Sequence, residues 1–309
     1  MIKYIVKRVI YLFITLFVIT TATFYLMHTI PGDPLTARVQ KNLPEQVRIN
    51  FEKKYGLDKP LYEQYGLFLK NMTQGDFGES ITYPGVKIAD RIFKTAPISG
   101  ALGGTALVIG FVLGMVLGII AALNRGKWPD YLVMFLAIIG IVLPSFVLAT
   151  LLQYVFANKL ALLPVMGWGS VKNAVLPVIA LSFGTIATYA RYMRSSVLEV
   201  INSDYILTAR AKGVSEFNIV RKHVFKNAFI PSLTILGPQI GGIFAGSFVI
   251  EKIFSIPGLG FFLVTSIQDR DYPMIISSTI FFAFLFVVAT LIVDVLYVIV
   301  DPRIKLTED

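Results

Sequence analysis

The chain of 309 residues contains no cysteine and only two histidines, His28 and His223. The lack of cysteine excludes disulfides, thiolate chemistry and cysteine-based zinc sites. Two histidines so far apart in sequence also argue against a metal site with several histidine ligands in one chain. The patterns GxxxxGK[ST], HExxH and GxSxG do not occur. We therefore expect no phosphate-binding loop, no zinc protease site, no serine hydrolase site and no ATP site within this polypeptide.

Charged residues are scarce as well. They make up 15% of the chain, against about 25% in soluble proteins, whereas 55% of the residues are hydrophobic and the mean hydropathy is +0.71. The net charge of +9 would suggest a nucleic-acid partner in a soluble protein. Here most basic residues flank long apolar runs, as the positive-inside rule expects. No RNA- or DNA-binding motif occurs, so we expect no nucleic-acid partner.

Six apolar runs predict an all-α integral membrane protein with six transmembrane helices. The runs cover residues 9–30, 98–123, 131–156, 174–192, 231–250 and 274–300. The first run has about 22 residues, enough to cross roughly 30 Å of hydrocarbon. We interpret residues 1–30 as an uncleaved first span. The alternative is a cleaved signal peptide, which would leave a mature chain that begins near Pro31.

Residues 31–97 are too polar to enter lipid, and we expect them to form a folded segment on the outer side, with helices near residues 44–55 and 61–72. Three glycines in the second run recur at every fourth position, which gives a smooth helix face for a neighbouring helix; they are Gly110, Gly114 and Gly118. Pro144 lies inside the third run and predicts a kink there.

Basic residues predict the orientation. The N-terminus, residues 124–130, residues 191–226 and the C-terminus together hold fourteen basic residues, whereas the two short connections on the other side hold four. Lys and Arg are enriched in cytosolic loops. Both termini are therefore expected in the cytosol, with six spans between them.

The most basic short connection is Ser203–Pro231. It has two acidic residues, Asp204 and Glu216, and five basic ones: Arg210, Lys212, Arg221, Lys222 and Lys226. The stretch predicts two short helices, the first starting at an N-cap Ser203 and ending at Gly213. Tyr205, Ile206 and Ala209 share a face of the first helix, which we expect to be exposed and able to enter the groove of a soluble partner. Phe217, Val220 and Val224 form an apolar stripe on the second helix. The residues alone allow two readings, a basic loop that orients the protein and a docking surface for a partner.

Asp294 is the one carboxylate well inside an apolar run. Such groups usually face a protein interior or water. Because it lies only seven residues before Asp301, we favour a structural role near the cytosolic boundary over a proton relay.

Two stretches of the basic connection resemble the cytosolic loop of bacterial ATP-binding-cassette (ABC) importer permeases: TARAKG (Thr208–Gly213) and RKHVFKNAFIP (Arg221–Pro231). The family pattern is Glu-Ala-Ala, three residues, then Gly. Leu207 stands at the glutamate position, a departure that resembles peptide-importer relatives, and Gly213 matches. Further motifs are similar to the dipeptide, oligopeptide and nickel subgroup, in order along the chain: PGDP, GDFGES, FVIEKIFSIPGLG, RDYP and DVLYVIVDPR.

The resemblance implies a MetI-like type I importer permease of the bacterial cytoplasmic membrane. Its five-helix core would cover residues 98–301, with a coupling loop at 194–230 and a cytosolic tail at 302–309. The chain would form half of the pathway of an ATP-driven peptide importer. Its partners would be a homologous permease, two cytosolic ATPases that bind ATP and magnesium, an extracytoplasmic peptide-binding protein and the lipid bilayer.

The resemblance also implies roles for individual residues. The residues expected to couple to the ATPases are Tyr205, Ile206, Thr208, Ala209, Arg210, Ala211 and Gly213. We assign a pathway or structural role to Asp294, Pro231 and Glu251. The alternatives are a stand-alone channel or ion-coupled carrier, which predicts more polar residues within the spans, and an intramembrane enzyme, whose catalytic residues are missing from the sequence.

Overall fold

A computed structural model describes residues 2–29, 49, 53, 56, 58–83 and 85–300. Within this part of the chain every regular element is a helix, and the only β-type pairing is an isolated bridge between Glu79 and Lys87. The predicted all-α class is confirmed. The chain divides into two compact units: unit one comprises residues up to 8, 100–256 and from 286 onward, and unit two comprises 9–99 and 257–285.

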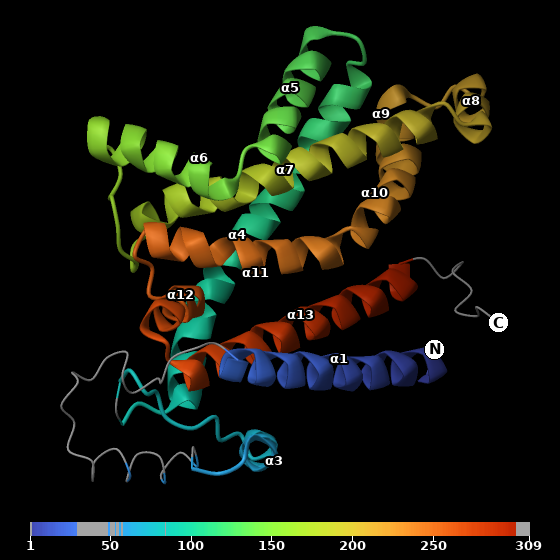
Figure 1. Ribbon diagram of the computed structural model, residues 1–309. Coiled ribbons are helices and arrows are strands. Elements are labelled where there is room, and N and C mark those ends of the chain that lie inside the picture. Colours follow the sequence, from blue (N-terminus) through green and yellow to red (C-terminus); the bar gives the residue numbers. More distant parts are fainter. Residues whose placement is uncertain are drawn as a thin grey trace. The chain divides into compact units, whose positions relative to one another are not determined.

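Figure 1 labels most of these elements along the chain. Their bounds, including two π-helical segments η1 and η2, are α1 Ile2–Thr29, α3 Leu61–Thr73, α4 Ile88–Leu123, α5 Trp128–Val142, α6 Ser145–Leu152, η1 Gln153–Lys159, α7 Val171–Ile201, α8 Asp204–Ala211, α9 Glu216–Asn218, η2 Ile219–Val224, α10 Phe225–Thr234, α11 Leu236–Ile253, α12 Leu259–Asp269 and α13 Tyr272–Val300.

Four helices of the described chain are long and apolar enough to cross a membrane: Val6–Thr29, Ile88–Leu123, Val171–Ile201 and Tyr272–Val293. The pair α5 and α6–η1 makes a fifth if the two bent parts count as one span. The span predicted at residues 231–250 is not among them. There the chain breaks at Ile235 between α10 and α11, and α11 also holds Gln239, Glu251 and Lys252. The count of six spans stays a prediction.

The helix α4 is longer than the predicted span. It begins at Ile88, ten residues before the expected start at 98, and Pro97 lies inside it. Its 36 residues correspond to about 54 Å of helix. The expected boundary at residue 97 therefore falls within a helix, although the two compact units do divide nearby, between Ser99 and Gly100. The helix expected at 61–72 is confirmed as α3, whereas most of residues 44–55 and the tail 302–309 lie outside the described residues.

The kink predicted at Pro144 is a full break of 105° between α5 and α6. Leu143 is extended, with φ −78° and ψ 117°, because the proline ring disfavours the helical conformation in the residue before it. Pro144 is extended too and becomes the N-cap of α6. Two successive non-helical residues redirect the chain, where a proline within a continuous helix would only bend it.

The glycine face of α4 packs against α7 in unit one, as its spacing predicts. A Cβ atom built on Gly114 would lie 2.6 Å from the Cβ of Tyr189 and 2.8 Å from the Ile186 carbonyl oxygen. Gly110 and Gly118 approach α7 equally closely. A side chain at any of these positions would overlap α7, so the two helices touch through their backbones.

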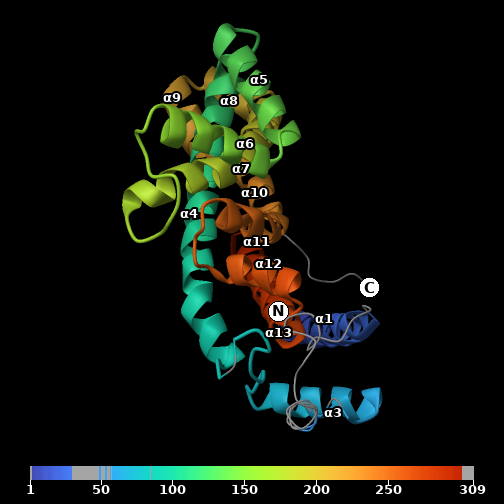
Figure 2. The ribbon, with the colours of Figure 1, turned by 60° about the vertical axis from the view of Figure 1, so that its left-hand side comes forward.

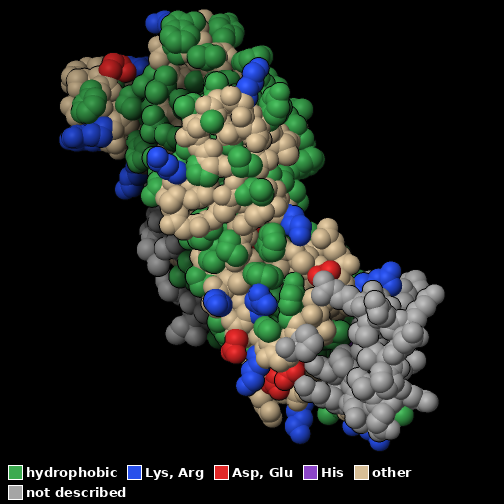
Figure 3. All heavy atoms as spheres, turned by 90° about the vertical axis from the view of Figure 1, so that its left-hand side faces the viewer, with side chains coloured by type: hydrophobic (Ala, Val, Ile, Leu, Met, Phe, Trp, Pro, Cys, Tyr) green, Lys and Arg blue, Asp and Glu red, His purple; other side chains and the backbone are tan. Residues whose placement is uncertain are grey.

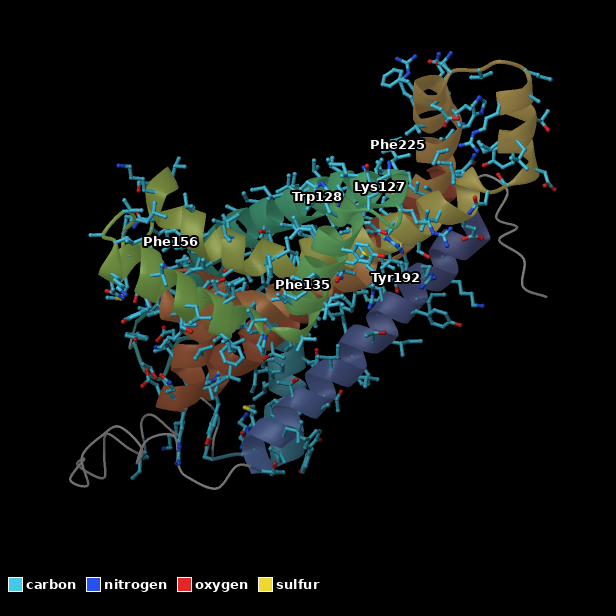
Figure 4. The ribbon with its side chains drawn as sticks, turned by 90° about the horizontal axis from the view of Figure 1, so that it is seen from above. Lys127, Trp128, Phe135, Phe156, Tyr192 and Phe225 are labelled. Atoms are coloured by element: carbon cyan, nitrogen blue, oxygen red, sulfur yellow. The ribbon has the colours of Figure 1, made fainter. Side chains whose placement is uncertain are left out.

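The helix α7 is the centre of unit one, because α5, α6, α10 and α11 all pack against it. α5, α6 and α7 lie together in Figures 1 and 2. α5 buries Val133, Ala137 and Gly140 and exposes its opposite side, including Trp128 and Phe135, which Figure 4 labels. Hydrophobic side chains also cover much of the surface seen in Figure 3. Such a surface is suited to lipid or to another apolar subunit.

In unit two, two motifs far apart in sequence meet at Asp271. The carboxylate of this residue is fully buried. It accepts hydrogen bonds from the Ser80 hydroxyl and from the backbone N–H groups of Ile81, Thr82 and Met274. GDFGES is thereby joined to RDYP. Several N–H and O–H donors compensate for the burial of the charge, so this cluster ties the segment before α4 to the start of α13.

The other contact of unit two joins α1, α3 and α13. Phe24 of α1 is buried with Ile276 and Ile280 of α13, and partly buried side chains of α3 pack against them. Thr21 and Tyr65 share a hydrogen bond of 2.6 Å. This contact gives α3 its place next to the first span.

We predict that Gly114→Ala destabilises the protein, because its new methyl group must displace either the α7 backbone or Tyr189. Overpacking of this kind costs about 1–3 kcal/mol. The matched control is Gly104→Ala on the same helix, where a Cβ meets nothing within 4 Å. Alanine there should be neutral or stabilising by up to about 1 kcal/mol. Unfolding of the purified variants in detergent measures the difference, and equal stabilities would contradict the packing described here.

Candidate functional site

The predicted coupling helix exists as α8, Asp204–Ala211. It begins after Ser203, which is the N-cap by its extended backbone. The Ser203 hydroxyl donates to the Val200 carbonyl at 2.6 Å, so it closes α7 and does not cap α8. Figure 1 shows α8 beyond the end of α7, next to α9 and the start of α10. The chain leaves the membrane-type helix α7 and returns through η2 and α10.

Gly213 ends α8 as the sequence predicts. Its φ is +77°, and its N–H donates to the Arg210 carbonyl at 2.9 Å, while the Val214 N–H donates to the Ala209 carbonyl at 3.2 Å. These two bonds form a Schellman motif, which needs a residue in the left-handed region. A Cβ atom at Gly213 would meet nothing within 4 Å. Glycine is therefore required for its backbone conformation and not for space.

The side of α8 that faces the protein differs from the expectation. Ile206 was expected to be exposed for docking, but it is completely buried among Met193 and Val197 of α7, Ile219 and Val224 of η2, and residues of α4 and α10. Ala209 is partly buried against the same cluster. Apolar burial of one helix face anchors the helix. The expected exposure of Ile206 is wrong, since this side chain fixes α8 to the ends of α4, α7 and α10.

The exposed side of α8 consists of other predicted residues. Thr208, Arg210 and Ala211 are exposed, Tyr205 is 46% exposed, and Leu207 is 53% exposed. Leu207, at the glutamate position of the family pattern, was not among the expected contact residues. The periodicity could have indicated it, because Leu207 points about 100° away from Ile206 around the helix, so burial of Ile206 turns Leu207 toward the edge of the buried face. An accessible face of small and apolar side chains is what a partner groove can receive.

Polar contacts fix α8 to the segments that follow it. The Arg210 guanidinium donates to both Glu216 oxygens at 2.7 and 3.2 Å, and Asn227 donates to the Tyr205 hydroxyl at 3.0 Å. The hydrogen bonds that Arg210 donates to Glu216 lower the pKa of Glu216 and raise the pKa of Arg210. The attraction is present above the ordinary glutamate pKa and is lost as the pH falls through the lowered value. Solvent screens this exposed pair, so it orients the loop more than it stabilises it.

The second helix of the stretch differs from its predicted stripe. Val224 is buried as expected, with Ile219 as its neighbour, but Phe217 is 71% exposed. The Arg221 guanidinium lies 5.6 Å from the Phe217 ring centroid. The buried residues differ from the predicted stripe because residues 219–224 form a π-helical segment, whose side chains do not follow the 3.6-residue period.

An ion pair between a buried aspartate and a partly buried arginine, which the sequence did not reveal, supports this region. Arg194 near the end of α7 donates to both Asp130 oxygens at 2.5 and 2.7 Å. Asp130 is only 3% exposed and also accepts from the Gly126 N–H at 3.0 Å. This two-pronged geometry is the strong form of an arginine–carboxylate pair. The pair fixes the first turn of α5 to α7, five residues beyond the buried Tyr189.

The pathway or structural residues are dispersed. Glu251 is completely buried in α11, and Pro231 lies within α10 with its ring exposed. Asp294 lies in α13, and its side chain is outside the described residues. Among the described side chains, α8 forms no hydrogen bond or packed cluster with Glu251 or Pro231. Within the described residues, no three His, Asp or Glu side chains are grouped as metal ligands.

Comparison with known proteins gives family and fold. Residues 114–306 match the model of the family described as binding-protein-dependent transport system inner membrane component, and residues 1–84 match the N-terminal model of the same kind of protein. The chain is 46% identical over 306 residues to the dipeptide transport system permease protein of Bacillus subtilis, covering 99% of both chains. It is 42% identical to the oligopeptide transport system permease protein of Escherichia coli K12, covering 99% of this chain and all of the relative.

Two solved structures share the fold at low identity. One, an inward-facing MetNI methionine ABC transporter, matches with TM-score 0.55 and 16% identity over 68% of this chain and 96% of that chain. The other, an amino acid ABC transporter with histidines, has TM-score 0.53 and 17% identity over 70% and 94%. The MetI-like fold expected from the sequence is confirmed.

We predict that Arg194→Gln destabilises the protein by about 3 kcal/mol, because it leaves the Asp130 carboxylate buried without its cation. The double variant with Asp130→Asn should lose less than the sum of the two single variants, since it removes both charges. Unfolding of the four proteins in detergent gives the coupling energy. Arg210→Gln is the control for an exposed pair and should have a much smaller effect; additive single variants would contradict a buried interaction.

Proposed function

We propose that this chain, which belongs to the family of binding-protein-dependent transport system inner membrane components, is the membrane permease subunit of an ABC importer for dipeptides or oligopeptides. Full-length similarity to peptide permeases is the observation that supports this function. It favours an ABC permease over a stand-alone channel or an ion-coupled carrier. The protein is a multi-pass component of the inner membrane and a transport subunit.

The proposed complex has four further parts. A homologous permease would supply the other half of the pathway, two cytosolic ATPases would bind ATP and magnesium, and an extracytoplasmic peptide-binding protein would deliver the substrate. The family description, with its dependence on a binding protein, supports the last of these. No phosphate-binding loop occurs in this sequence, so hydrolysis is assigned to the partners. Both termini are proposed to lie in the cytosol, on the side of the basic connection.

The proposed role of α8 is to couple the ATPases to the membrane helices. Its outer face would enter a groove of a soluble partner, while Ile206 on its inner face is packed among α4, α7, η2 and α10. A push on the outer face would therefore reach several membrane helices through one packed cluster. Closure of the ATPases is proposed to move these helices together.

The function is tested by reconstituting the chain with its homologous permease, the two ATPases and the binding protein in liposomes. We expect uptake of a labelled dipeptide or oligopeptide only when ATP, magnesium and the binding protein are all present. Liposomes that contain this chain alone should take up none. Uptake by the chain alone would support a channel or carrier and overturn the proposal.

The docking face of α8 is tested by Leu207→Asp. A carboxylate on this half-exposed leucine would have to be desolvated in the partner groove, so retention of the ATPases should fall by about tenfold or more. Leu162→Asp is the matched control, because Leu162, 65% exposed, is an even more exposed leucine in the connection before α7. Co-purification and peptide-stimulated ATP hydrolysis provide the readouts. Normal assembly and uptake with Leu207→Asp would contradict docking through this face.

A further inference from the structure

A cavity of about 270 Å³ with both polar and apolar lining residues opens in unit one where α5 breaks from α6. It is bordered by Gly140, Ile141 and Ser145 at the break, by residues of α7, and by Gln239 and Ile243 of α11. The break turns α6 by 105° away from the direction of α5. A straight helix would have continued along α5, and the bend leaves this side of α7 uncovered.

Small residues give the cavity its depth. Gly140 is packed so closely on α7 that a Cβ atom would lie 2.7 Å from the Cβ of Ala187. Gly184 of α7 faces it and lies next to the Gly140 carbonyl oxygen. Thr185 is 3% exposed and packs against Gly110 of α4. A Cβ atom built on Gly110 would lie 2.6 Å from the Thr185 Cβ. The wall of the cavity is thus formed by tightly packed helices.

The polar lining is neutral. The polar residues that line the cavity are Ser145, Thr185, Thr188 and Gln239, beside apolar ones such as Leu181, and none of its described lining residues is charged. Thr188 donates to the Gly184 carbonyl at 2.9 Å, so its hydroxyl offers acceptor lone pairs to the cavity. The backbone N–H of Gln239 donates to the Ile235 carbonyl at 3.2 Å, but in the described part of the chain no hydrogen bond holds the side-chain amide of Gln239 or the Ser145 hydroxyl. Polar groups within apolar helices are costly unless a partner satisfies them.

We propose that this cavity binds the main chain of the peptide in transit, a proposal that rests on the peptide-importer function. A peptide group offers one N–H donor and one C=O acceptor, and the Gln239 amide is complementary because it offers both kinds of group. The volume admits about one or two residues at a time. Without a charge the site does not select among peptide side chains. Two other occupants fit this cavity less well. A hard cation would need several oxygen ligands, usually with carboxylates. An apolar helix of the second permease would leave the side-chain amide of Gln239 unsatisfied.

The test uses the reconstituted complex and two substitutions that keep side-chain size. Gln239→Leu and Thr188→Val should each lower dipeptide uptake about tenfold, as expected for loss of one or two hydrogen bonds, with binding-protein-stimulated ATP hydrolysis retained. Thr150→Val is the matched control, because Thr150 donates to its own helix at the Phe146 carbonyl but does not line the cavity. Its uptake should equal that of the wild type.

A second variant gives a readout that a structural role would not produce. Gln239→Glu places a negative charge in the cavity, so the uptake ratio of lysine-containing to glutamate-containing dipeptides should rise severalfold over the wild-type ratio. The chain has no cysteine, so Gln239→Cys also provides a single alkylation site. Its labelling by N-ethylmaleimide should slow during peptide turnover, and labelling of Thr150→Cys should not.

Three results would overturn the proposal: wild-type uptake in Gln239→Leu and Thr188→Val, an unchanged ratio in Gln239→Glu, or loss of the second permease from the variant complexes. The last would mean that a helix of the partner permease fills the cavity. If Gln239→Leu does not fold, Gln239→Glu and Thr188→Val still decide the question. Absence of peptide uptake by the wild-type complex would instead reject the importer function itself, which keeps the two failures distinct.

Discussion

The packing of unit one depends on the contact between α4 and α7, in which two backbones touch without side chains between them. In a membrane the hydrophobic effect does not drive two apolar helices together, because lipid tails are as apolar as the helices, so dispersion and close fit must hold them. The glycines at 110, 114 and 118 make that fit possible. Because α5, α6, α10 and α11 pack on α7 in turn, the position of α7 decides where the break at Pro144, the cavity and α8 lie.

The site at α8 combines an anchored and an exposed face. Ile206 is immobilised in a cluster shared by three helices and η2, whereas Tyr205 and Leu207 remain accessible. The buried pair of Asp130 and Arg194 stiffens the same end of α7. An isolated helix of eight residues would be only marginally stable in water. The packing of α8 against its neighbours gives it the rigidity that transmission of force requires.

Local features were predictable, and long-range pairings were not. The glycine period of α4, the helix end at Gly213 and the effect of Pro144 follow from backbone rules that act over a few residues. The burial of Ile206, by contrast, depends on α4, α7 and α10 converging at one place. The Asp130–Arg194 pair joins positions 64 residues apart, and the Ser80–Asp271 bond joins positions 191 apart. No pattern in a single sequence connects such partners.

The buried pair of Asp130 and Arg194 also has a consequence for biogenesis. Two side chains that share hydrogen bonds at 2.5 and 2.7 Å must lie on the same side of the bilayer, so the chain between them crosses it an even number of times. The Ser80–Asp271 bond imposes the same parity on residues 80–271. A nascent chain in which one span between the two partners of a pair is inverted could not close that pair and would keep an uncompensated carboxylate. The two pairs thus act as checkpoints of correct insertion, independent of the basic residues that set its direction.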